Sequence, residues 1–553
     1  MDVNITVITG PREKPVERTV KKGTTIQSLA EEYKNLPYTV LAAKVNNKIT
    51  ELTRTIECPG CIEFLDMRSQ AGFLIYQRSL SLLYMKAIND VMGKASVLIE
   101  NSLNKGLYTE INERGSVTAK QVKEIEARMR ELVELDIPFI KEHMSREDAF
   151  RVLIAEGYKE KERMLKKSEV QILPFYSLDG FRNFFYGQMV PSTRYIPYFE
   201  LRKYRSGVLL RFPHPSQPNK IPPYVDEIQL YKVFREAKLW SKLMQISYVG
   251  DLNETIESGE YKEVIQISEA LHEKKIAQIA DMIAKKKKRI ILISGPSSSG
   301  KTTFSKRLII QLRVNGLKPL YVGTDDYFLE RHQTPKDEHG EPNYEDIVAL
   351  DIELFNSDMN RLLKGETVDM PTFDFVNGTK IFGKRIAKAE EGQPIIIEGI
   401  HSLNKKLTEY IPDEEKFKIY ISPLTQLSID EHNRIPTTDA RMIRRLVRDY
   451  LFRGSSAQET IQSWPKVRMG EDKNIFPYNG EADVFFNSEH IYELSVLRKY
   501  AEPLLLKITQ EEPEYGEAIR ILKYLQYFKI IEDDTVIAKN SILREFIGGS
   551  IFV

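Results

Sequence analysis

The sequence predicts an α/β protein whose C-terminal half contains a doubly wound parallel sheet. Five apolar runs in this half are typical of strands, and segments with helical periodicity separate them, which is the alternation that builds a parallel sheet. These runs are residues 290–293, 319–323, 394–397, 416–421 and 482–486. The chain has 553 residues, which is too many for a single hydrophobic core, so we expect three or more domains.

The net charge places few limits on function. It is +1 at neutral pH, so the chain has no overall attraction for nucleic acid or acidic partners, and any basic surface must be local. No apolar run is long enough to cross a membrane, and the N-terminus lacks the pattern of a signal peptide. We therefore expect a cytoplasmic protein without a membrane partner, and we expect it to be a homo-oligomer.

The first of the five strand runs leads directly into a glycine-rich sequence. Residues 295–302 read Gly-Pro-Ser-Ser-Ser-Gly-Lys-Thr and fit the phosphate-loop pattern G-x-x-x-x-G-K-[ST]. In such a loop, backbone N–H groups surround phosphate oxygens, the lysine reaches the β- and γ-phosphates, and the last hydroxyl binds Mg²⁺. The residues expected to bind ATP are Gly295, Ser297, Ser298, Ser299, Gly300, Lys301, Thr302 and Thr303. The chain is thus predicted to bind a nucleoside triphosphate at the start of a helix.

Polar residues follow two later strand runs, at the edge of the sheet where ligands of such folds bind. Asp325 comes after the second run and Glu398 directly after the third. Phosphoryl transfer to a hydroxyl requires a carboxylate near the nucleophile, another near Mg²⁺, and cations around the γ-phosphate. Asp325 and Glu398 fit the first two requirements. The alternative is a helix N-cap, which suits the neighbouring Asp326 better than Glu398.

Arginines at helical spacing are the candidate cations. Intervals of three and four residues place them on shared faces of one helix, which suits a lid that closes over phosphates. A solvated helix face is the other interpretation. The arginines concerned are Arg441, Arg444, Arg445 and Arg448.

Six stretches of this half resemble, in order, the uridine kinase and phosphoribulokinase family. They are residues 295–303, 325–328, 343–346, 371–375, 398–400 and 444–449, and the resemblance covers about residues 286–490. It implies a P-loop NTPase kinase domain that uses ATP and Mg²⁺ to phosphorylate an alcohol. By position, the resemblance implies that Asp325 is the general base and that Lys301 and Arg448 are further catalytic residues. It places Glu398 with Thr302 in the Mg²⁺ environment, Arg444 in contact with ATP, and Glu345 beside the ribose. The lid cations are Arg445, Arg448 and Arg453, and the residues next to the substrate are Phe328, Phe373, Arg445 and Arg453.

Three positions depart from that family and weaken the expected choice of nucleobase. The base-reading tyrosine of the family corresponds to Phe373, its histidine to Gly378, and one lid arginine to Ser455. Loss of hydrogen-bonding groups reduces discrimination between substrates. We expect phosphorylation of a nucleoside 5′-hydroxyl, with uridine or cytidine as the substrate. The alternatives are a kinase of another small alcohol, or an NTP-dependent RNA-binding or regulatory protein, with RNA the less favoured partner.

The N-terminal residues predict a small β-rich module. Residues 4–8 alternate, residues 24–33 fit a helix, and residues 40–45 and 62–65 fit strands, an order that suggests a β-grasp fold over residues 1–66. Residues 22–30 and 42–48 resemble the TGS domain of threonyl-tRNA synthetases. Cys58 and Cys61 form the only C-x-x-C pair, for which half a zinc site, a redox pair and a Pro-Gly turn are the alternatives, the turn being favoured.

Residues 67–212 resemble the second, editing-type α+β domain of the same synthetases. The resemblance is carried by residues 78–83, 98–108, 124–129, 145–149 and 187–193. The four metal-ligand or acid–base positions of that domain correspond to Arg78, Leu82, Phe185 and Met189, none of which can serve either role. We expect no editing activity, and no class II core follows that could charge tRNA. A small-molecule pocket, an RNA surface and a scaffold remain as roles, with the scaffold favoured.

Two further segments complete the predicted domain organisation. Residues 213–288 are interpreted as a Pro-rich linker and a helical connector, which ends in the basic run 285–289. That run fits a solvated helix end better than a nucleic-acid patch, because cations are favoured at a helix C-terminus. The kinase domain is expected over 289–490, and residues 491–553 form a helical tail without an assigned chemical role.

Overall fold

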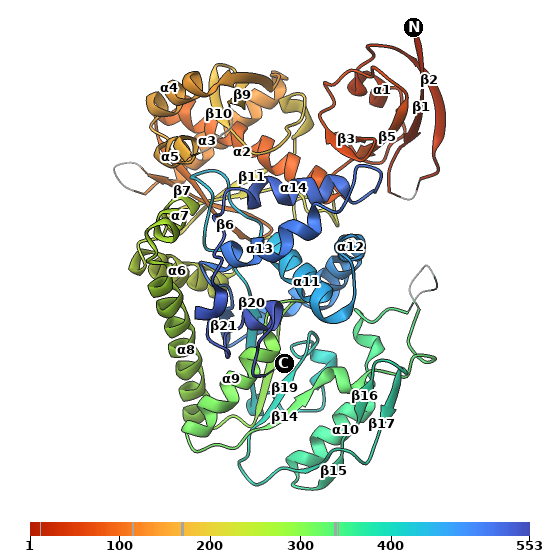
Figure 1. The fold of residues 1–553 in the computed structure, drawn as a ribbon, viewed down its shortest axis with the longest axis vertical. Coiled ribbons are helices and arrows are strands. Elements are labelled where there is room, and N and C mark those ends of the chain that lie inside the picture. The colour runs from red at the N-terminus through yellow and green to blue at the C-terminus, as the bar shows by residue number, and fades with distance from the viewer. Residues whose placement is uncertain (12, 113–115, 168–170, 337–339, 341, 553) are drawn as a thin grey trace.

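The computed structural model describes residues 1–11, 13–112, 116–167, 171–336, 340 and 342–552. Figure 1 shows an elongated arrangement, with the N-terminal sheet at one end and the parallel sheet toward the other. Helices from the C-terminal part of the chain lie between them. Among the described residues, no helix combines the length and apolar character that crossing a membrane requires.

The N-terminal region is a five-stranded sheet with one helix. Its strands follow the order β2-β1-β5-β3-β4, and β1 pairs with β5 in parallel. The bounds are β1 Asp2–Ile8, β2 Val16–Lys21, α1 Ile26–Glu31, β3 Ala42–Val45, β4 Lys48–Thr50 and β5 Gly60–Leu65. Alternate residues of β1 are buried, as the sequence predicts, and Thr25 caps α1 by accepting a hydrogen bond from the Ser28 N–H. The exposed edge strand β2 was not predicted, because almost all of its side chains face solvent.

A long helix, α2, forms the centre of the second region. A four-stranded sheet in the order β11-β12-β7-β6 and a three-stranded sheet in the order β10-β9-β8 accompany it. The bounds are α2 Gln70–Met92, β6 Ser96–Leu103, β7 Gly106–Asn112, α3 Ala119–Glu134, β8 Ile140–Ser145, α4 Arg146–Glu156, α5 Lys159–Lys167, β9 Ile172–Leu178, β10 Phe181–Phe184, β11 Glu200–Tyr204 and β12 Gly207–Arg211. Fifteen residues of α2 are buried, which is why this helix is apolar on most of its circumference.

The parallel sheet in the C-terminal half follows the order β14-β19-β13-β20-β21, and each of the five predicted strand runs forms one of its strands. The bounds are β13 Ile290–Ser294, β14 Leu320–Gly323, β19 Ile395–Glu398, β20 Lys416–Ser422 and β21 Val484–Asn487. Ile291 and Ile293 point into one apolar cluster, whereas Ile290 and Leu292 point into another. Both faces of the sheet are therefore covered, which confirms the predicted α/β fold of this region.

Helices cover the two faces and small hairpins extend the sheet region. The helices are α6 Ile228–Leu243, α7 Val249–Ser258, α8 Tyr261–Lys286, α9 Lys301–Val314, α10 Ile352–Leu363, α11 Thr437–Arg453, α12 Ala457–Asn474, α13 Glu493–Leu505, α14 Tyr515–Leu525 and α15 Arg544–Ile547. Two antiparallel pairs join β15 Thr367–Asp369 to β18 Ile386–Lys388 and β16 Thr372–Asp374 to β17 Thr379–Ile381. These four strands of three residues each were not predicted from the sequence.

One hydrophobic core extends beyond the predicted limits of the kinase domain. Ile276, Ile279 and Ile283 of α8 pack in the same cluster as β13 and α9, and so do residues of the C-terminal segment such as Phe546. Helix α8 is thus a structural part of the kinase region, although the sequence placed it in a connector. The segment after residue 490 likewise contributes to this core instead of standing apart as a tail.

Candidate active site

The phosphate loop lies between β13 and α9, and its glycines are required by the backbone. Gly300 adopts a φ of +82°, which other residues rarely adopt. A Cβ at Gly295 would lie 2.1 Å from the backbone oxygen of Ile421, which is too close for any side chain. Among the described residues, the hydroxyls of Ser298 and Ser299 are buried without a hydrogen-bond partner. These buried hydroxyls lack a partner in the protein, and the oxygens of a bound phosphate could accept hydrogen bonds from them.

Glu398 ends β19 and lies next to the first turn of α9. The Thr302 hydroxyl is 3.4 Å from its Oε2, and the Tyr321 hydroxyl donates a hydrogen bond of 2.9 Å to the same oxygen. Burial raises the pKa of the Glu398 carboxyl to about 7, with Lys301 acting in the opposite direction and Asp325 and Glu545 adding to the rise. Four apolar residues before Glu398 hold it at the inner edge of the sheet. The predicted proximity of Glu398 and Thr302 is therefore present in the structure.

Asp325 lies in a short 3₁₀ turn, Thr324–Tyr327, directly after β14. Its side chain is accessible to solvent, but the protein atoms around it disfavour the charged form and raise the pKa of the carboxyl. Lys301 and Arg453 act in the opposite direction, and Asp326 adds to the rise. Asp326 itself pairs with Arg385 at 2.8 Å, so its role is structural and it does not cap a helix. Lys301 is thus close enough to Asp325 to act on the charge of its carboxyl group.

Glu345 approaches the same site from the segment before α10. A Cβ on Gly470 of α12 would lie 2.6 Å from the Glu345 Cβ, so the two backbones pack closely. Burial raises the pKa of the Glu345 carboxyl, and Arg445 and Lys301 oppose this effect. The structure therefore gathers Lys301, Asp325, Glu345 and Glu398 in one place, although they are far apart in the sequence.

The arginines of α11 divide into two groups. Arg441 and Arg444 are fully buried, pair with Glu471 and Glu493, and donate hydrogen bonds to the backbone oxygens of Ser297 and Ser298. These two differ from the predicted open lid, because they hold the phosphate loop in place from behind. Arg444 is in addition covered by the ring of Phe546, whose centroid lies 4.8 Å from the guanidinium carbon.

The second group of arginines shares a single carboxylate partner. Arg445, Arg448 and Arg453 all pair with Asp449, and the Arg445 guanidinium donates a hydrogen bond of 3.1 Å to the Ser297 hydroxyl. The Arg453 side chain is 58% exposed. Three arginines thus share the one buried carboxylate of Asp449, which leaves positive charge available for phosphate oxygens.

An aromatic cluster lies beyond Asp325. The rings of Phe328 and Phe373 are 5.8 Å apart, and Tyr344 and Phe375 lie against them at 5.8 Å from Phe328 and 5.1 Å from Phe373. Gly378 adopts a φ of +69°, and a Cβ there would lie 2.7 Å from the Cβ of Arg331. A histidine at this position would therefore be strained, which accounts for the departure from the resembled family in physical terms.

Three charged or polar residues of the site were missed by sequence reasoning. Glu471 accepts a hydrogen bond of 3.1 Å from the Ser297 N–H, and Glu545 accepts hydrogen bonds from Thr303. Neither belongs to a motif, so no local signal could have identified them. His401 follows Glu398 in the sequence, and its buried ring has no hydrogen-bond partner among the described residues. Burial lowers the pKa of His401 to about 4.

A phosphate loop after the first strand of a parallel sheet, with carboxylates and arginines around it, defines a nucleotide-dependent phosphotransferase fold. Residues 290–494 match the model of the phosphoribulokinase/uridine kinase family. The chain belongs to this family through that region.

Curated relatives agree with this family. The chain is 29% identical to a uridine kinase of Leuconostoc citreum over 175 residues, which is 32% of this chain and 75% of the relative. It is 31% identical to a uridine kinase of Ligilactobacillus salivarius over 175 residues, or 32% and 73% of the two chains. A solved structure of a possible uridine kinase from Bacillus stearothermophilus matches 37% of this chain and 96% of its own with 23% identity, but its TM-score of 0.25 supports no structural argument.

Proposed function

We propose that the chain is an ATP-dependent kinase that phosphorylates the 5′-hydroxyl of a nucleoside, with uridine or cytidine as substrate. The observation that carries this proposal is the meeting of Lys301, Asp325 and Glu398 at the carboxyl ends of β13, β14 and β19. A fold that only bound nucleotide would not need a second carboxylate facing the phosphate-loop lysine. The uridine kinase names of the relatives support the acceptor class.

Asp325 is the proposed general base. Its solvent-accessible carboxylate accepts the proton of the acceptor hydroxyl as the oxygen attacks the γ-phosphorus; the bond from this phosphorus to the β–γ bridging oxygen breaks, and ADP leaves. The surroundings that raise the pKa of Asp325 make it a better proton acceptor. The positive charges of Lys301 and Arg453 both act on this carboxylate, and they would counter the negative charge of the transferring phosphoryl group. Arg445 and Arg448 add cations from α11 when the lid closes.

The donor set beside the phosphate loop fits Mg²⁺. The Thr302 hydroxyl and the Glu398 carboxylate are hard oxygen ligands 3.4 Å apart, and burial leaves Glu398 in need of a positive partner. Among the described residues, there is no group of three or more His, Cys, Asp or Glu side chains suited to a metal, so phosphate and water oxygens would complete the coordination. When bound, the ion supplies charge neutralisation on the phosphates.

The acceptor is proposed to lie between Glu345 and the aromatic cluster of Phe328, Tyr344, Phe373 and Phe375. Aromatic rings offer a face on which a nucleobase can stack, while Glu345 offers a carboxylate to the ribose hydroxyls. This environment favours a nucleoside over a small polar alcohol. Since neither Phe373 nor Gly378 has a polar side chain, the shape of the base is expected to count for more than its hydrogen-bonding edge.

For the N-terminal half we propose a TGS-like module followed by a degenerate synthetase-like domain that acts as a scaffold. Leu82, Phe185 and Met189 are almost fully buried in one apolar core, and the Arg78 guanidinium donates to the backbone oxygen of Gln188 at 2.6 Å. These contacts leave the four positions without a ligand set for a metal. They support the loss of editing chemistry.

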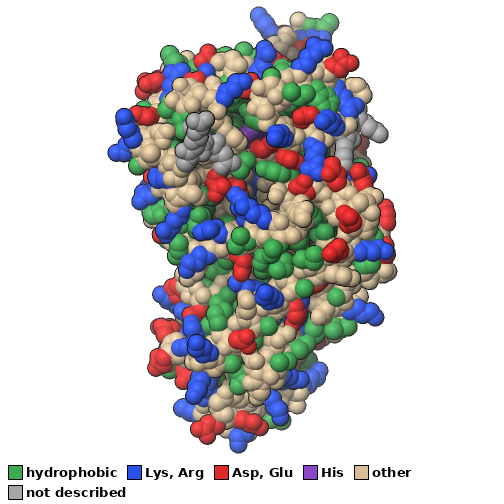
Figure 2. Space-filling view, turned by 90° about the vertical axis from the view of Figure 1, so that its left-hand side faces the viewer, with side chains coloured by type: hydrophobic (Ala, Val, Ile, Leu, Met, Phe, Trp, Pro, Cys, Tyr) green, Lys and Arg blue, Asp and Glu red, His purple; other side chains and the backbone are tan. Residues whose placement is uncertain are grey.

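A small-molecule acceptor is also favoured over RNA by the distribution of charge. Basic and acidic side chains are interspersed on the face shown in Figure 2. Within the basic run 285–289, Lys286 pairs with Asp483 and Arg289 donates to the backbone oxygen of Leu363. The run is therefore bound to its own domain, which supports a solvated helix end.

The test is a screen of the purified full-length protein with ATP and Mg²⁺ against the common nucleosides, pantothenate and ribulose 5-phosphate. ADP release and the mass of the product identify the acceptor. Turnover of uridine or cytidine that disappears in Lys301→Ala supports the proposal. Activity on a non-nucleoside alcohol alone would replace the nucleoside assignment, and absence of any transfer would remove the kinase proposal.

A further inference from the structure

The C-terminal segment, residues 541–548, lies directly on the phosphate loop. The Glu545 carboxylate accepts a hydrogen bond of 3.1 Å from the Thr303 N–H and one of 2.7 Å from the Thr303 hydroxyl. Thr303 is the third residue of α9, so this N–H is one of the unsatisfied donors that a helix N-terminus offers to anions. A carboxylate of the chain itself thus occupies a donor that the sequence predicts for ATP.

Two apolar side chains of the same segment pack on the loop and on an arginine that supports it. The Ile542 Cγ2 would lie only 2.4 Å from a Cβ placed on Gly300, so its side chain packs directly on the loop. The Phe546 ring lies over the guanidinium of Arg444. Both side chains are fully buried. Ile542 thus covers Gly300 of the loop, while Phe546 anchors the segment on the arginine that supports the loop.

We propose that the phosphate loop binds two alternative occupants, ATP and the chain's own segment 541–548, and that ATP binding displaces this segment. The proposal rests on the ATP-dependent activity proposed above. The two occupants cannot coexist, because Glu545 would place a negative charge beside phosphate oxygens that use the same donor. The segment therefore acts as a built-in competitor for nucleotide.

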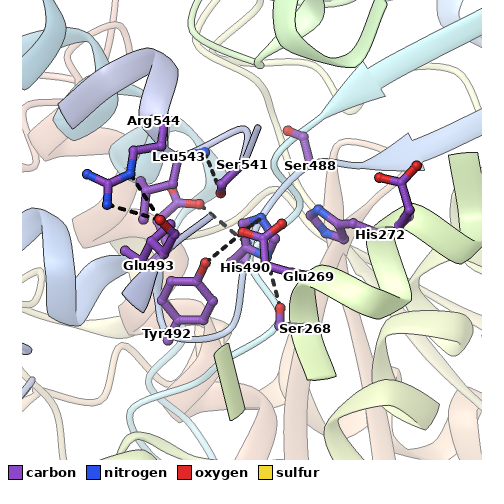
Figure 3. A network of polar contacts seen from close by, with 12 residues as sticks. Ser268, Glu269, His272, Ser488, His490, Tyr492, Glu493, Ser541, Leu543 and Arg544 are labelled. Carbon is purple, nitrogen blue, oxygen red and sulfur yellow. Dashed lines mark hydrogen bonds and ion pairs between the residues drawn. The ribbon is translucent and has the colours of Figure 1, made fainter. Parts of the chain in front are cut away.

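The segment is anchored to elements that also support the loop. Figure 3 shows Ser541, Leu543 and Arg544 near Tyr492 and Glu493. Glu493 pairs with Arg444, and Tyr492 donates a hydrogen bond of 3.0 Å to Glu269 of α8. Arg544 donates hydrogen bonds to the backbone oxygens of Asp534 and Ile537. The residues before the segment thus hold it close to the loop.

Because the segment is covalently attached, its competition with ATP affects the apparent dissociation constant in a predictable way. A segment attached next to its own binding site has a high effective concentration, so ATP must compete against it at every encounter. The apparent dissociation constant for ATP then equals the intrinsic value divided by the fraction of molecules in which the loop is open. Weakening the segment should tighten ATP binding without any change in the residues that touch ATP.

The test measures ATP binding by the full-length protein in four forms: wild type, Glu545→Gln, Glu532→Gln and Lys301→Ala. Glu545→Gln weakens two charge-assisted hydrogen bonds, so its apparent affinity for ATP should rise roughly tenfold. Glu532 is exposed in the same C-terminal region, and its substitution is a matched control that should leave affinity unchanged. Lys301→Ala should lose ATP binding whatever the segment does.

Hydrogen exchange on the wild-type protein gives a second, mutation-independent readout. Saturating ATP should increase exchange of the backbone amides of residues 541–548. If ATP binds while this segment stays protected, or if Glu545→Gln and wild type bind ATP equally, Glu545 is only a helix cap and the inference is overturned. If neither form binds ATP, the proposed kinase function fails instead, so the two failures are distinguishable.

Discussion

The chain resembles a functional site of a known family at two places, and the sequence predicts that the functional side chains are lost at the first and retained at the second. In the N-terminal half, Leu82, Phe185 and Met189 fill an apolar core and are 0%, 2% and 2% exposed. In the kinase region, Asp325 and Glu398 remain as carboxylates whose pKa values are raised by their surroundings. The first set stabilises the fold, whereas the second set lies in surroundings that disfavour its charged form.

This difference indicates which substitutions should affect stability and which should affect chemistry. Burying an aliphatic side chain stabilises a protein, whereas burying a carboxylate costs free energy unless a cation or a ligand compensates. The kinase site keeps one such buried carboxylate, Glu398, near Lys301, where phosphates and a divalent ion would complete the charge balance. Variants in the two regions should therefore separate loss of activity from loss of stability.

The largest effect is expected at Asp325. Asp325→Asn removes the proposed general base while keeping the shape of the side chain, so turnover should fall by roughly 10² to 10⁴. Binding of ATP should be nearly unchanged, because the proposed role of Asp325 concerns the acceptor hydroxyl and not the nucleotide. Steady-state kinetics and ATP titration on the same preparation check this. Wild-type turnover in the variant would remove Asp325 from the mechanism.

The opposite result is expected at Leu82. Leu82→Ala opens a cavity in the N-terminal core and should lower the free energy of unfolding of that region by about 2–5 kcal/mol. The kinase turnover should stay within about twofold, since the site contains none of these atoms. Leu135→Ala is the matched control, because Leu135 is 65% exposed. Denaturant unfolding measures the stability of each variant, and steady-state kinetics measures its turnover. A Leu82→Ala variant that loses turnover but keeps its stability would contradict the assignment of Leu82 to a purely structural role.

A smaller effect concerns the acceptor. Uridine, cytidine and purine nucleosides should differ by less than about 10²-fold in kcat/KM, because Phe373 and Gly378 present no polar side chain to the base. The 2′-deoxy analogue should be poorer, since it leaves the carboxylate of Glu345 without a partner. In Glu345→Gln this preference for ribose should shrink. Sharp selectivity for one base would show that another group reads it.

The smallest effect concerns pH and the buried histidines. Burial lowers the pKa of both His272 and His490 well below the ordinary value, and the two rings lie 3.9 Å apart. Only the unfolded chain binds protons there as pH falls below about 6.5, so each histidine reduces the unfolding free energy by up to about 1.4 kcal/mol per pH unit.

The neighbouring Glu489 acts in the other direction. Burial raises the pKa of its carboxyl from the ordinary value of 4.5 to about 8. Between these two values the unfolded chain loses the proton more readily than the folded protein, so this group lowers the free energy of unfolding as pH rises. A comparison of slopes separates the two effects. Between pH 7 and 5.5, the melting temperature of His490→Gln should fall less than that of the wild type. Parallel slopes would mean that His490 does not control acid stability.

The sequence predicted the parallel sheet and the phosphate loop because both depend on local pattern. β-branched runs such as 290–293 need no distant partner to be recognised, and the spacing of Gly295 and Gly300 is a backbone requirement. The strands β15 to β18 were not predicted, because a strand of only three residues is too short to establish an alternation.

Glu471 and Glu545 escaped prediction for a different reason. Each is one acidic residue in a helix, and its importance arises only when the fold brings it to Ser297 or Thr303. The burial of Arg444 was missed in the same way, because helical spacing cannot tell a lid from a buried support. Tertiary contact, and not propensity, decided these positions.

The packing of α8 against α9 has a practical consequence for any work on isolated fragments. A recombinant piece cut to residues 290–494 would expose the apolar side of α9 that Ile276, Ile279 and Ile283 cover in the intact chain. Such a piece is expected to aggregate, and its inactivity would say nothing about catalysis. In the whole protein, α8, β13 and α9 follow one another in sequence, so this unit needs only local contacts and should be among the first parts to fold.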